Sequence, residues 1–311
     1  MQKQFTQFAD NIRLTSLQIE DAKTKYKGVC EKLHSSYYET NYDGKTKLLF
    51  GSYKTKTNVR PISENQDVDV LFKIPKETLD KFKAYESNGP SSLLQEVKDY
   101  LNEKYTTTDE IKAWGKIVQV KFTDNKHNVE VIPGYEEEDG TFTIPNSENG
   151  GSWDVFDPRQ QLEDFKVSNK TTNGLTAELT RMIKTWVDNT ASCEYKSFKL
   201  LGDVIKFLEN KFKSGANYDE YSKVVKEFFE FLENNCETAI ESYVKTALDR
   251  AKKAYDFENE EKPKEASEEW RKIFGKDGKS EFPLVSGNPI KENNTRTFST
   301  PSSPYGNYKF D

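Results

Sequence analysis

The chain has 311 residues with 52 acidic and 46 basic side chains, so its net charge is −6, and its charged fraction of 32% exceeds the usual value of about 25%. This balance argues against sequence-independent binding of long nucleic acid, which needs clustered lysine and arginine to displace counterions. Three widely spaced cysteines and two histidines exclude a CxxC zinc ribbon, a disulfide framework and a histidine-rich metal site. Any divalent metal would be held by carboxylates, which hard cations such as Mg²⁺ accept.

The size and apolar content predict a folded protein of about two domains or two joined lobes. Only 34% of the residues are hydrophobic, but 20 Phe, 16 Tyr and 4 Trp residues bury large areas and can build sizeable cores. No run of about 18 apolar residues occurs, and the N-terminus lacks the apolar stretch of a signal peptide. We therefore expect a cytoplasmic protein that does not enter a membrane.

The first half of the chain predicts one long helix followed by a mixed sheet. Thr15 and Gln18 form a capping box, and apolar residues then recur at helical spacing up to Tyr37. Strand formers predict a buried strand at residues 67–72, an antiparallel hairpin of residues 116–122 and 127–132 with a four-residue loop, and an edge strand at residues 141–144.

The second half predicts helices almost to the end. The helix at residues 175–186 has one apolar face and a second face that carries Arg181 and Lys184. Further helices are predicted at residues 198–212, 218–232, 238–255 and 268–274. The chain is therefore predicted to be an α+β protein with a cleft between its lobes. Its predicted parts are an N-terminal helix at 1–40 that packs on both lobes, a sheet core at 41–168, a helical lobe at 169–288 and a poorly ordered tail at 289–311.

Three acidic residues have the spacing that metal-assisted phosphoryl transfer needs. Asp67 and Asp69 lie two residues apart on a predicted strand, so both carboxylates point to the same side. In isolation, such a pair is more often two solvated acids at a strand end. Here a Gly51-Ser52 turn lies upstream, and Glu130 alternates with apolar neighbours on the hairpin. Three acids on adjacent strands beside a small-residue turn can bridge two Mg²⁺ ions while the turn holds a triphosphate.

These motifs resemble a known family. The segment from Gly51 to Pro61, followed by Asp67-Val68-Asp69, resembles the signature of the polymerase-beta-like nucleotidyltransferases and, more narrowly, of the bacterial CD-NTases. The CD-NTases are SMODS-type enzymes related to cyclic GMP-AMP synthase, and they make cyclic nucleotide signals in CBASS anti-phage defence. Further landmarks follow in family order: Val131-Ile132-Pro133, Ile144-Pro145-Asn146, Gly151 to Trp153, Arg181 to Trp186, Lys196-Ser197-Phe198 and Glu268 to Gly275. The resemblance covers roughly Phe5 to Pro283.

The resemblance implies roles for individual residues and places the active site in the cleft between the lobes. It makes Asp67, Asp69 and Glu130 ligands of two Mg²⁺ ions, for which Mn²⁺ can substitute, and makes Gly51 and Ser52 phosphate contacts. In the helical lobe it implies that Lys184 and Ser197 contact the triphosphate, that Phe198 stacks on a nucleobase and that Asn169 reads a base edge.

Three of these residues could instead have ordinary structural roles. Lys184 could be a solvated helix lysine, Phe198 could belong to the core with Leu201 and Ile205, and Asn169 could cap a helix. We favour the phosphate role for Lys184 and leave the other two open. The chain also departs from the family pattern at Glu130, because aspartate is more usual there.

The resemblance implies an enzyme that condenses NTPs into a cyclic di- or oligonucleotide with release of pyrophosphate. Two other functions stay open: nucleotide transfer to RNA or protein, and nucleotide binding by a regulator without turnover. We expect a monomer. We also expect no activation by DNA, because the net charge is negative and no Cys/His cluster can build a zinc-binding insertion. Its regulatory or effector partners would be proteins of a defence operon.

Overall fold

The computed structural model describes residues 1–63, 66–108, 110–123, 127–212, 220–275 and 281–285. The predicted tail at 289–311 and most of the predicted hairpin loop lie outside these residues. The chain forms two compact units. We call Leu14–Asn58 with Ile62–Leu162 the sheet unit, and Met1–Arg13 with Val59–Pro61 and Glu163–Asp311 the helical unit. No helix in the described ranges is long and apolar enough to cross a membrane.

The predicted N-terminal helix is present, and a shorter helix precedes it. The capping box is formed as expected, since Gln18 N donates to Thr15 Oγ1 (3.3 Å) and Thr15 N donates to Gln18 Oε1 (2.8 Å). It begins α2 (Ser16–Tyr37), which belongs to the sheet unit. The preceding α1 (Gln2–Asn11) buries Phe5 and Phe8 in the core of the helical unit. The first 40 residues are therefore divided between the two units.

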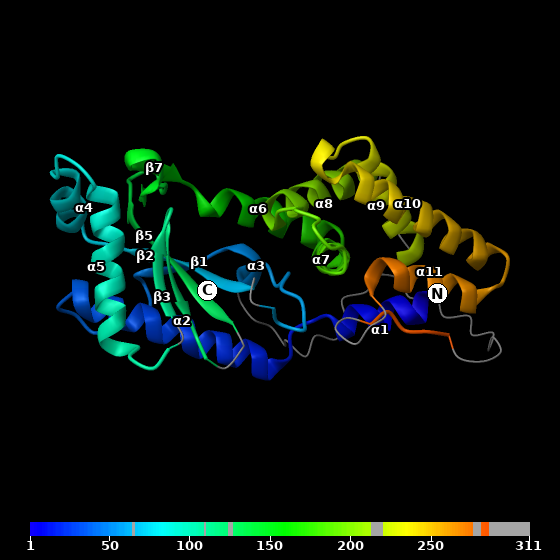
Figure 1. The fold of residues 1–311 in the computed structure, drawn as a ribbon, viewed down its shortest axis with the longest axis horizontal. Helices are drawn as coiled ribbons and strands as arrows, with labels where there is room; N and C mark the ends of the chain where they lie inside the picture. The colour runs from blue at the N-terminus through cyan, green and yellow to red at the C-terminus, as the bar shows by residue number, and fades with distance from the viewer. Residues whose placement is uncertain (64–65, 109, 124–126, 213–219, 276–280, 286–311) are drawn as a thin grey trace. The chain divides into compact units, whose positions relative to one another are not determined.

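The sheet unit is built on a seven-stranded mixed sheet (Figure 1). Its strands are β1 (Lys47–Leu49), β2 (Asp67–Lys73), β3 (Glu110–Trp114), β4 (Ile117–Lys121), β5 (Asn128–Glu136), β6 (Phe142–Asn146) and β7 (Ser152–Phe156). The order is β1-β2-β5-β4-β3, and β6 joins β5 to β7. Among the strands of the described residues, β2 and β5 pair in parallel and the other pairs are antiparallel. The predicted hairpin is β4–β5, whereas the predicted edge strand is β6, which lies between two strands and so is not an edge. Strands β1, β3 and β7 were not predicted.

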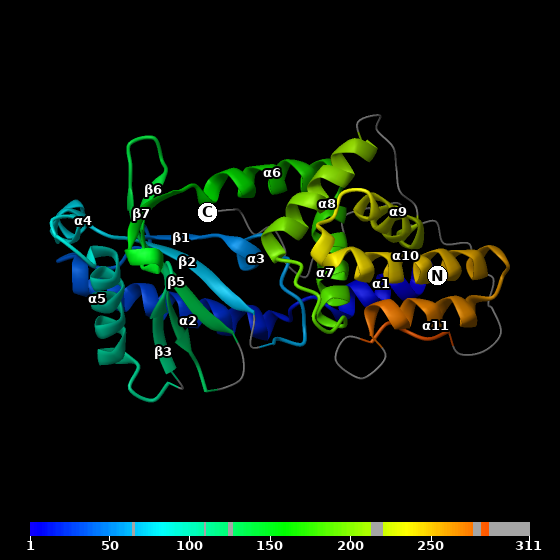
Figure 2. The ribbon, with the colours of Figure 1, turned by 45° about the horizontal axis from the view of Figure 1, so that its top comes forward.

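The two faces of the central strands differ in chemistry. Val68, Val70, Val129 and Val131 are fully buried on one face, in a core that they share with residues of α2 and α5 (Gly89–Lys104). Figure 2 shows both helices beside the sheet. Side chains alternate along a strand, so the residues between these valines point to the opposite face. The sheet unit also contains α3 (Gly51–Lys54), α4 (Lys76–Lys83) and the short 3₁₀ helix η1 (Glu148–Gly150).

The helical unit is held by an aromatic core, as the composition predicted. Its helices are α7 (Leu175–Asp188), α8 (Ser197–Phe212), α9 (Tyr221–Glu233), α10 (Thr238–Asn259) and α11 (Pro263–Phe274), in addition to α1. The rings of Phe5, Trp270, Phe274 and Phe282 contact one another with centroid distances of 4.9 to 6.1 Å. Helix α6 (Pro158–Thr171) begins in the sheet unit and ends in the helical unit.

Candidate active site

Three carboxylates occupy the face of the sheet opposite α2 and α5. Strands β2 and β5 pair in parallel with Asp69 beside Glu130, and Asp67 lies two residues earlier on β2. Because Val68, Val70 and Val129 are fully buried on the other face, the strands cannot rotate and the acids keep a common side. The prediction that these acids lie on adjacent strands is confirmed.

Two amide side chains contact the acids: Gln119 links Asp67 to Glu130, and Asn128 hydrogen-bonds to Asp67. Gln119, on β4, lies opposite Glu130 in the antiparallel register. Its Nε2 donates to Asp67 Oδ1 (3.3 Å) and to Glu130 Oε1 (3.2 Å). Asn128, beside Asp67 in the parallel register, also hydrogen-bonds to its carboxylate, and Asn128 Oδ1 accepts from Phe122 N (3.3 Å). Neither amide was predicted as a site residue.

The electrostatics of the cluster favour a bound cation. Burial first, and then the negative charges of Asp67 and Asp69, raise the pKa of Glu130 to about 8. Burial also raises the pKa of Asp67. The negative charge of Asp67 disfavours ionisation of Glu130, which favours a state in which one of the two carboxyl groups keeps its proton. A divalent cation would replace that proton and remove the repulsion.

A glycine turn touches Asp69 from β1. Gly51 has a positive φ of 64°, which glycine adopts without strain. A Cβ atom built on Gly51 would lie 2.0 Å from Asp69 Oδ2, far inside any real contact. Phe50 N donates to Asp69 O (3.3 Å), which holds the turn against β2. Position 51 therefore needs glycine for its backbone conformation and for the close approach of the carboxylate.

The rest of the turn is fixed by its own hydrogen bonds. Thr55 Oγ1 donates to Gly51 O (3.1 Å), and the hydroxyl groups of Thr55 and Thr57 lie 2.9 Å apart. Thr57 N donates to Ser52 O (2.9 Å), which closes the turn around the half-buried Ser52. Thr57 thus supports the loop, while Gly51 and Ser52 begin α3, with Gly51 against Asp69.

The donor chemistry of the cluster fits Mg²⁺, although its side chains are not arranged as a complete metal site. Within the described ranges, no three side chains of His, Cys, Asp or Glu stand in metal-binding geometry. Asp67, Asp69 and Glu130 nevertheless supply hard oxygen ligands on one face. Burial first, and then the charges of Asp67 and Asp69, raise the pKa of Glu130, and a bound cation would offset both effects. These three residues are the ones that would hold Mg²⁺.

The other predicted site residues belong to the helical unit. In α7 every residue from Leu175 to Ile183 is buried, so the predicted polar face is largely covered, including Arg181. Lys184 is only half-buried and interacts electrostatically with Asp188. Its phosphate role stays a prediction.

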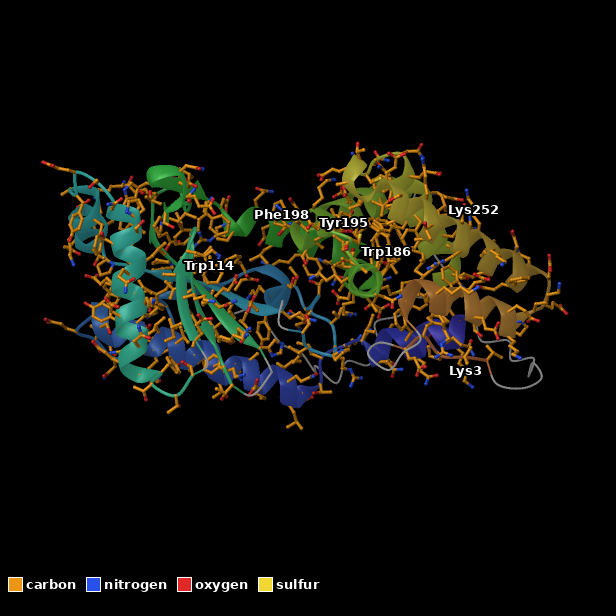
Figure 3. The ribbon with its side chains drawn as sticks, in the orientation of Figure 1. Lys3, Trp114, Trp186, Tyr195, Phe198 and Lys252 are labelled. Carbon is orange, nitrogen blue, oxygen red and sulfur yellow. The ribbon has the colours of Figure 1, made fainter. Side chains whose placement is uncertain are left out.

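Ser197 and Phe198 form the exposed first turn of α8 (Figure 3). The alternative in which Phe198 is a core residue is wrong, because 72% of its surface is exposed while Leu201 and Ile205 are buried. Just before this turn, the ring of Tyr195 contacts that of Trp186 with centroids 6.4 Å apart, and its hydroxyl donates to Asp203 on α8 (2.7 Å). The segment that leads into α8 is therefore tied to both α7 and α8.

Asn169 is a helix-capping residue. Its Oδ1 accepts a hydrogen bond from Ala177 N (3.0 Å) near the start of α7, which satisfies a donor that the helix itself leaves unpaired. The capping alternative is confirmed. A base-reading role for its side-chain NH₂ group stays a prediction.

Comparison with known proteins yields one family match and a set of structural likenesses. The family model described as Second Messenger Oligonucleotide or Dinucleotide Synthetase domain (SMODS) matches residues 1–169. No curated protein matches the chain. CdnC of E. coli MS115-1 with ATP gives a TM-score of 0.66 at 18% identity over 88% of this chain and 98% of that chain. CdnC has also been solved in a complex with HORMA-deltaN.

Two further structures extend the likeness to other bacteria. The apo form of Vibrio cholerae DncV gives a TM-score of 0.61 at 15% identity, over 86% of this chain and 91% of that chain. The CD-NTase CdnG of Bradyrhizobium diazoefficiens in complex with GTP gives 0.61 at 10% identity, over 88% and 94% of the two chains. The predicted α+β fold with a polymerase-beta-like mixed sheet is thereby confirmed.

Proposed function

Because this chain belongs to the family of SMODS domains, whose model matches more than half of it, we propose that it is a nucleotidyltransferase that makes a cyclic di- or oligonucleotide from NTPs. Each step would join a ribose hydroxyl of one nucleotide to the α-phosphorus of another and release pyrophosphate. The family match supports the class of reaction, and the site supports the mechanism.

The observation that carries the proposal is the contact between the glycine turn and the carboxylate cluster. Gly51 approaches Asp69 so closely that no side chain fits between them, and Asp69 is beside Glu130 across β2 and β5. A phosphate bound at the turn would therefore lie next to the acids. This proximity is what phosphoryl transfer with a pyrophosphate leaving group needs.

In one condensation step, residues of the sheet unit would bind the phosphates and the divalent cations. Gly51 lets the backbone approach the phosphate oxygens, and the Ser52 hydroxyl donates to them. Asp67, Asp69 and Glu130 would hold the divalent cations, while Gln119 and Asn128 hydrogen-bond to Asp67 and keep it in place. When bound, two Mg²⁺ or Mn²⁺ ions neutralise the triphosphate and lower the pKa of the attacking hydroxyl. The proton of that hydroxyl leaves to solvent, and the bond to pyrophosphate breaks.

The helical unit is proposed to contribute nucleotide contacts of its own. Phe198 presents an exposed ring, which can stack on any base. Ser197 precedes it in the first turn of α8, and Lys184 carries a half-buried ammonium group on α7. We include Asn169 only for its side-chain NH₂ group, since its oxygen caps α7.

We further propose that the product is a second messenger of anti-phage defence made in the cytoplasm by a monomeric enzyme. The net charge of −6 argues against activation by DNA. Control by another protein is supported by the likeness to CdnC, which has the same fold and has been solved in a complex with HORMA-deltaN.

The test is incubation of purified protein with each labelled NTP and Mg²⁺ or Mn²⁺, followed by phosphatase treatment of the products. Phosphatase-resistant product from the wild type and none from the double variant Asp67→Asn, Asp69→Asn is expected. The variant should fold, because removing clustered anions relieves repulsion in the metal-free protein. Equal product from the double variant, or label found only on added RNA or on protein, would contradict the proposal.

A further inference from the structure

We propose that Gln119 is a positioning residue that fixes the carboxylate of Glu130 relative to that of Asp67, so that the longer acid can share a cation with its neighbour. This inference deepens the proposed function and rests on it. It assigns a role to a residue outside the family signature, and it explains how the chain accommodates glutamate at a position where aspartate is more usual.

Strand register places Gln119 where this role requires. It lies opposite Glu130 in the antiparallel pair β4–β5, and Glu130 lies beside Asp69 in the parallel pair β2–β5. Val118 and Val120, the neighbours of Gln119 on β4, are fully buried on the opposite face. A slip of one residue would move both valines out of the core, so the register and the direction of the Gln119 side chain are firmly held.

One amide group serves two acids. Gln119 Nε2 reaches Asp67 Oδ1 at 3.3 Å and Glu130 Oε1 at 3.2 Å. These two acids come from different strands, and no backbone bond sets the distance between their side-chain oxygens. The amide supplies that link, and it can donate one hydrogen to each carboxylate. An acidic or aliphatic side chain at this position would leave the two groups to repel each other freely.

The hydrogen bond from Gln119 matters because the side chain of Glu130 is longer than that of aspartate. Glutamate has one more methylene than aspartate, and therefore one more rotatable bond to fix when it binds a cation. A hydrogen bond to Gln119 removes that freedom in advance. Residues that orient metal ligands in this way typically change metal affinity or activity by 10- to 100-fold when they are replaced.

The first experiment measures Mn²⁺ binding to the nucleotide-free protein by electron paramagnetic resonance. Gln119→Met keeps the length of the side chain and removes its hydrogen bonds. The matched control is Gln95→Met, since Gln95 Nε2 donates to Asp99 Oδ1 (2.7 Å) on the exposed side of α5, away from the site. We expect Gln119→Met to weaken Mn²⁺ binding by about tenfold or more, and Gln95→Met to leave it unchanged.

A second variant, Gln119→Asn, tests the inference if Gln119→Met does not fold. Gln119→Asn keeps the amide but shortens the side chain by one carbon–carbon bond, about 1.5 Å, so its donors no longer reach both acids. It should also weaken Mn²⁺ binding, and it decides the question if Gln119→Met does not fold. For the folded variant we expect kcat to fall while the KM for NTP stays close to that of the wild type, because Gln119 orients metal ligands and does not bind the nucleotide.

The inference and the proposed function can fail separately. A loss of Mn²⁺ affinity smaller than about fivefold in the folded Gln119 variant overturns the inference, since orienting residues normally have larger effects. Product formation by a wild-type protein that binds no Mn²⁺ without nucleotide also overturns it and leaves the proposed function standing. A wild type that binds Mn²⁺ through these residues but forms no nucleotide product overturns the proposed function alone.

Discussion

Replacing Gly51 with alanine should slow catalysis by about 100-fold while the protein stays folded. The new Cβ would lie 2.0 Å from Asp69 Oδ2, whereas real Cβ atoms keep at least 3.0 Å, so the carboxylate must move by about 1 Å. A misplacement of about 1 Å at a reacting centre can cost about 100-fold in rate. Because φ at Gly51 is 64°, alanine also adds backbone strain of about 1 to 2 kcal/mol. We expect that loss in the free energy of unfolding and a loss of about 100-fold in product formation.

Gly150→Ala is the matched control for this change. Gly150 lies in the same unit with a φ of 91°, but nothing stands within 4 Å of a Cβ built on it. It should therefore lose stability from backbone strain and keep its activity. Urea unfolding measures the stability of both variants, and release of pyrophosphate from NTPs measures their rates. If Gly51→Ala and Gly150→Ala formed product at similar rates, the contact between Gly51 and Asp69 would not matter for catalysis and the reasoning would be refuted.

Three further outcomes are expected. Glu130→Gln should stabilise the metal-free protein at pH 8 and not at pH 4, because the unfolded chain loses this proton near pH 4.3 whereas burial and Asp67 raise the folded pKa to about 8. Urea unfolding in EDTA that shows an equal gain at both pH values would contradict this. Lys184→Ala should weaken NTP binding by about 1.5 to 3 kcal/mol, measured by calorimetry, with exposed Lys206→Ala as the control; unchanged binding would return Lys184 to the role of a solvated lysine. Long duplex DNA at low salt should leave the rate unchanged, and a large salt-sensitive stimulation would be the opposite result.

Local sequence patterns predicted more than half of the helices and strands. They could not predict which strands pair when the strands are far apart in the chain. The hairpin β4–β5 followed from strand formers around a short loop, and its register could have placed Gln119 opposite Glu130. The parallel pairing of β2 with β5 could not be derived, because α4, α5, β3 and β4 lie between them in the chain. Helix α1 had a signal that was missed, since Phe5, Phe8, Ala9 and Ile12 recur at helical spacing and are all buried.

The carboxylate cluster was predictable because its residues lie on strands whose alternation is regular. Asp67 and Asp69 needed only period-two spacing, and Glu130 needed only apolar neighbours. Phe198 was harder, because its spacing to Leu201 suits a core face although it lies in the exposed first turn of α8. Asn169 shows the same limit, since its hydrogen bond to Ala177 depends on how α6 meets α7.

The most direct test of the central claim is the ratio of pyrophosphate released to nucleotide incorporated in the purified product. Ring closure uses every triphosphate, so a cyclic product requires one pyrophosphate for each nucleotide and leaves no phosphatase-sensitive end. We predict a ratio of about one pyrophosphate per incorporated nucleotide for the wild type, and no product from the Asp67→Asn, Asp69→Asn variant. A product that keeps a terminal triphosphate, or incorporation that depends on an added RNA or protein acceptor, would contradict it.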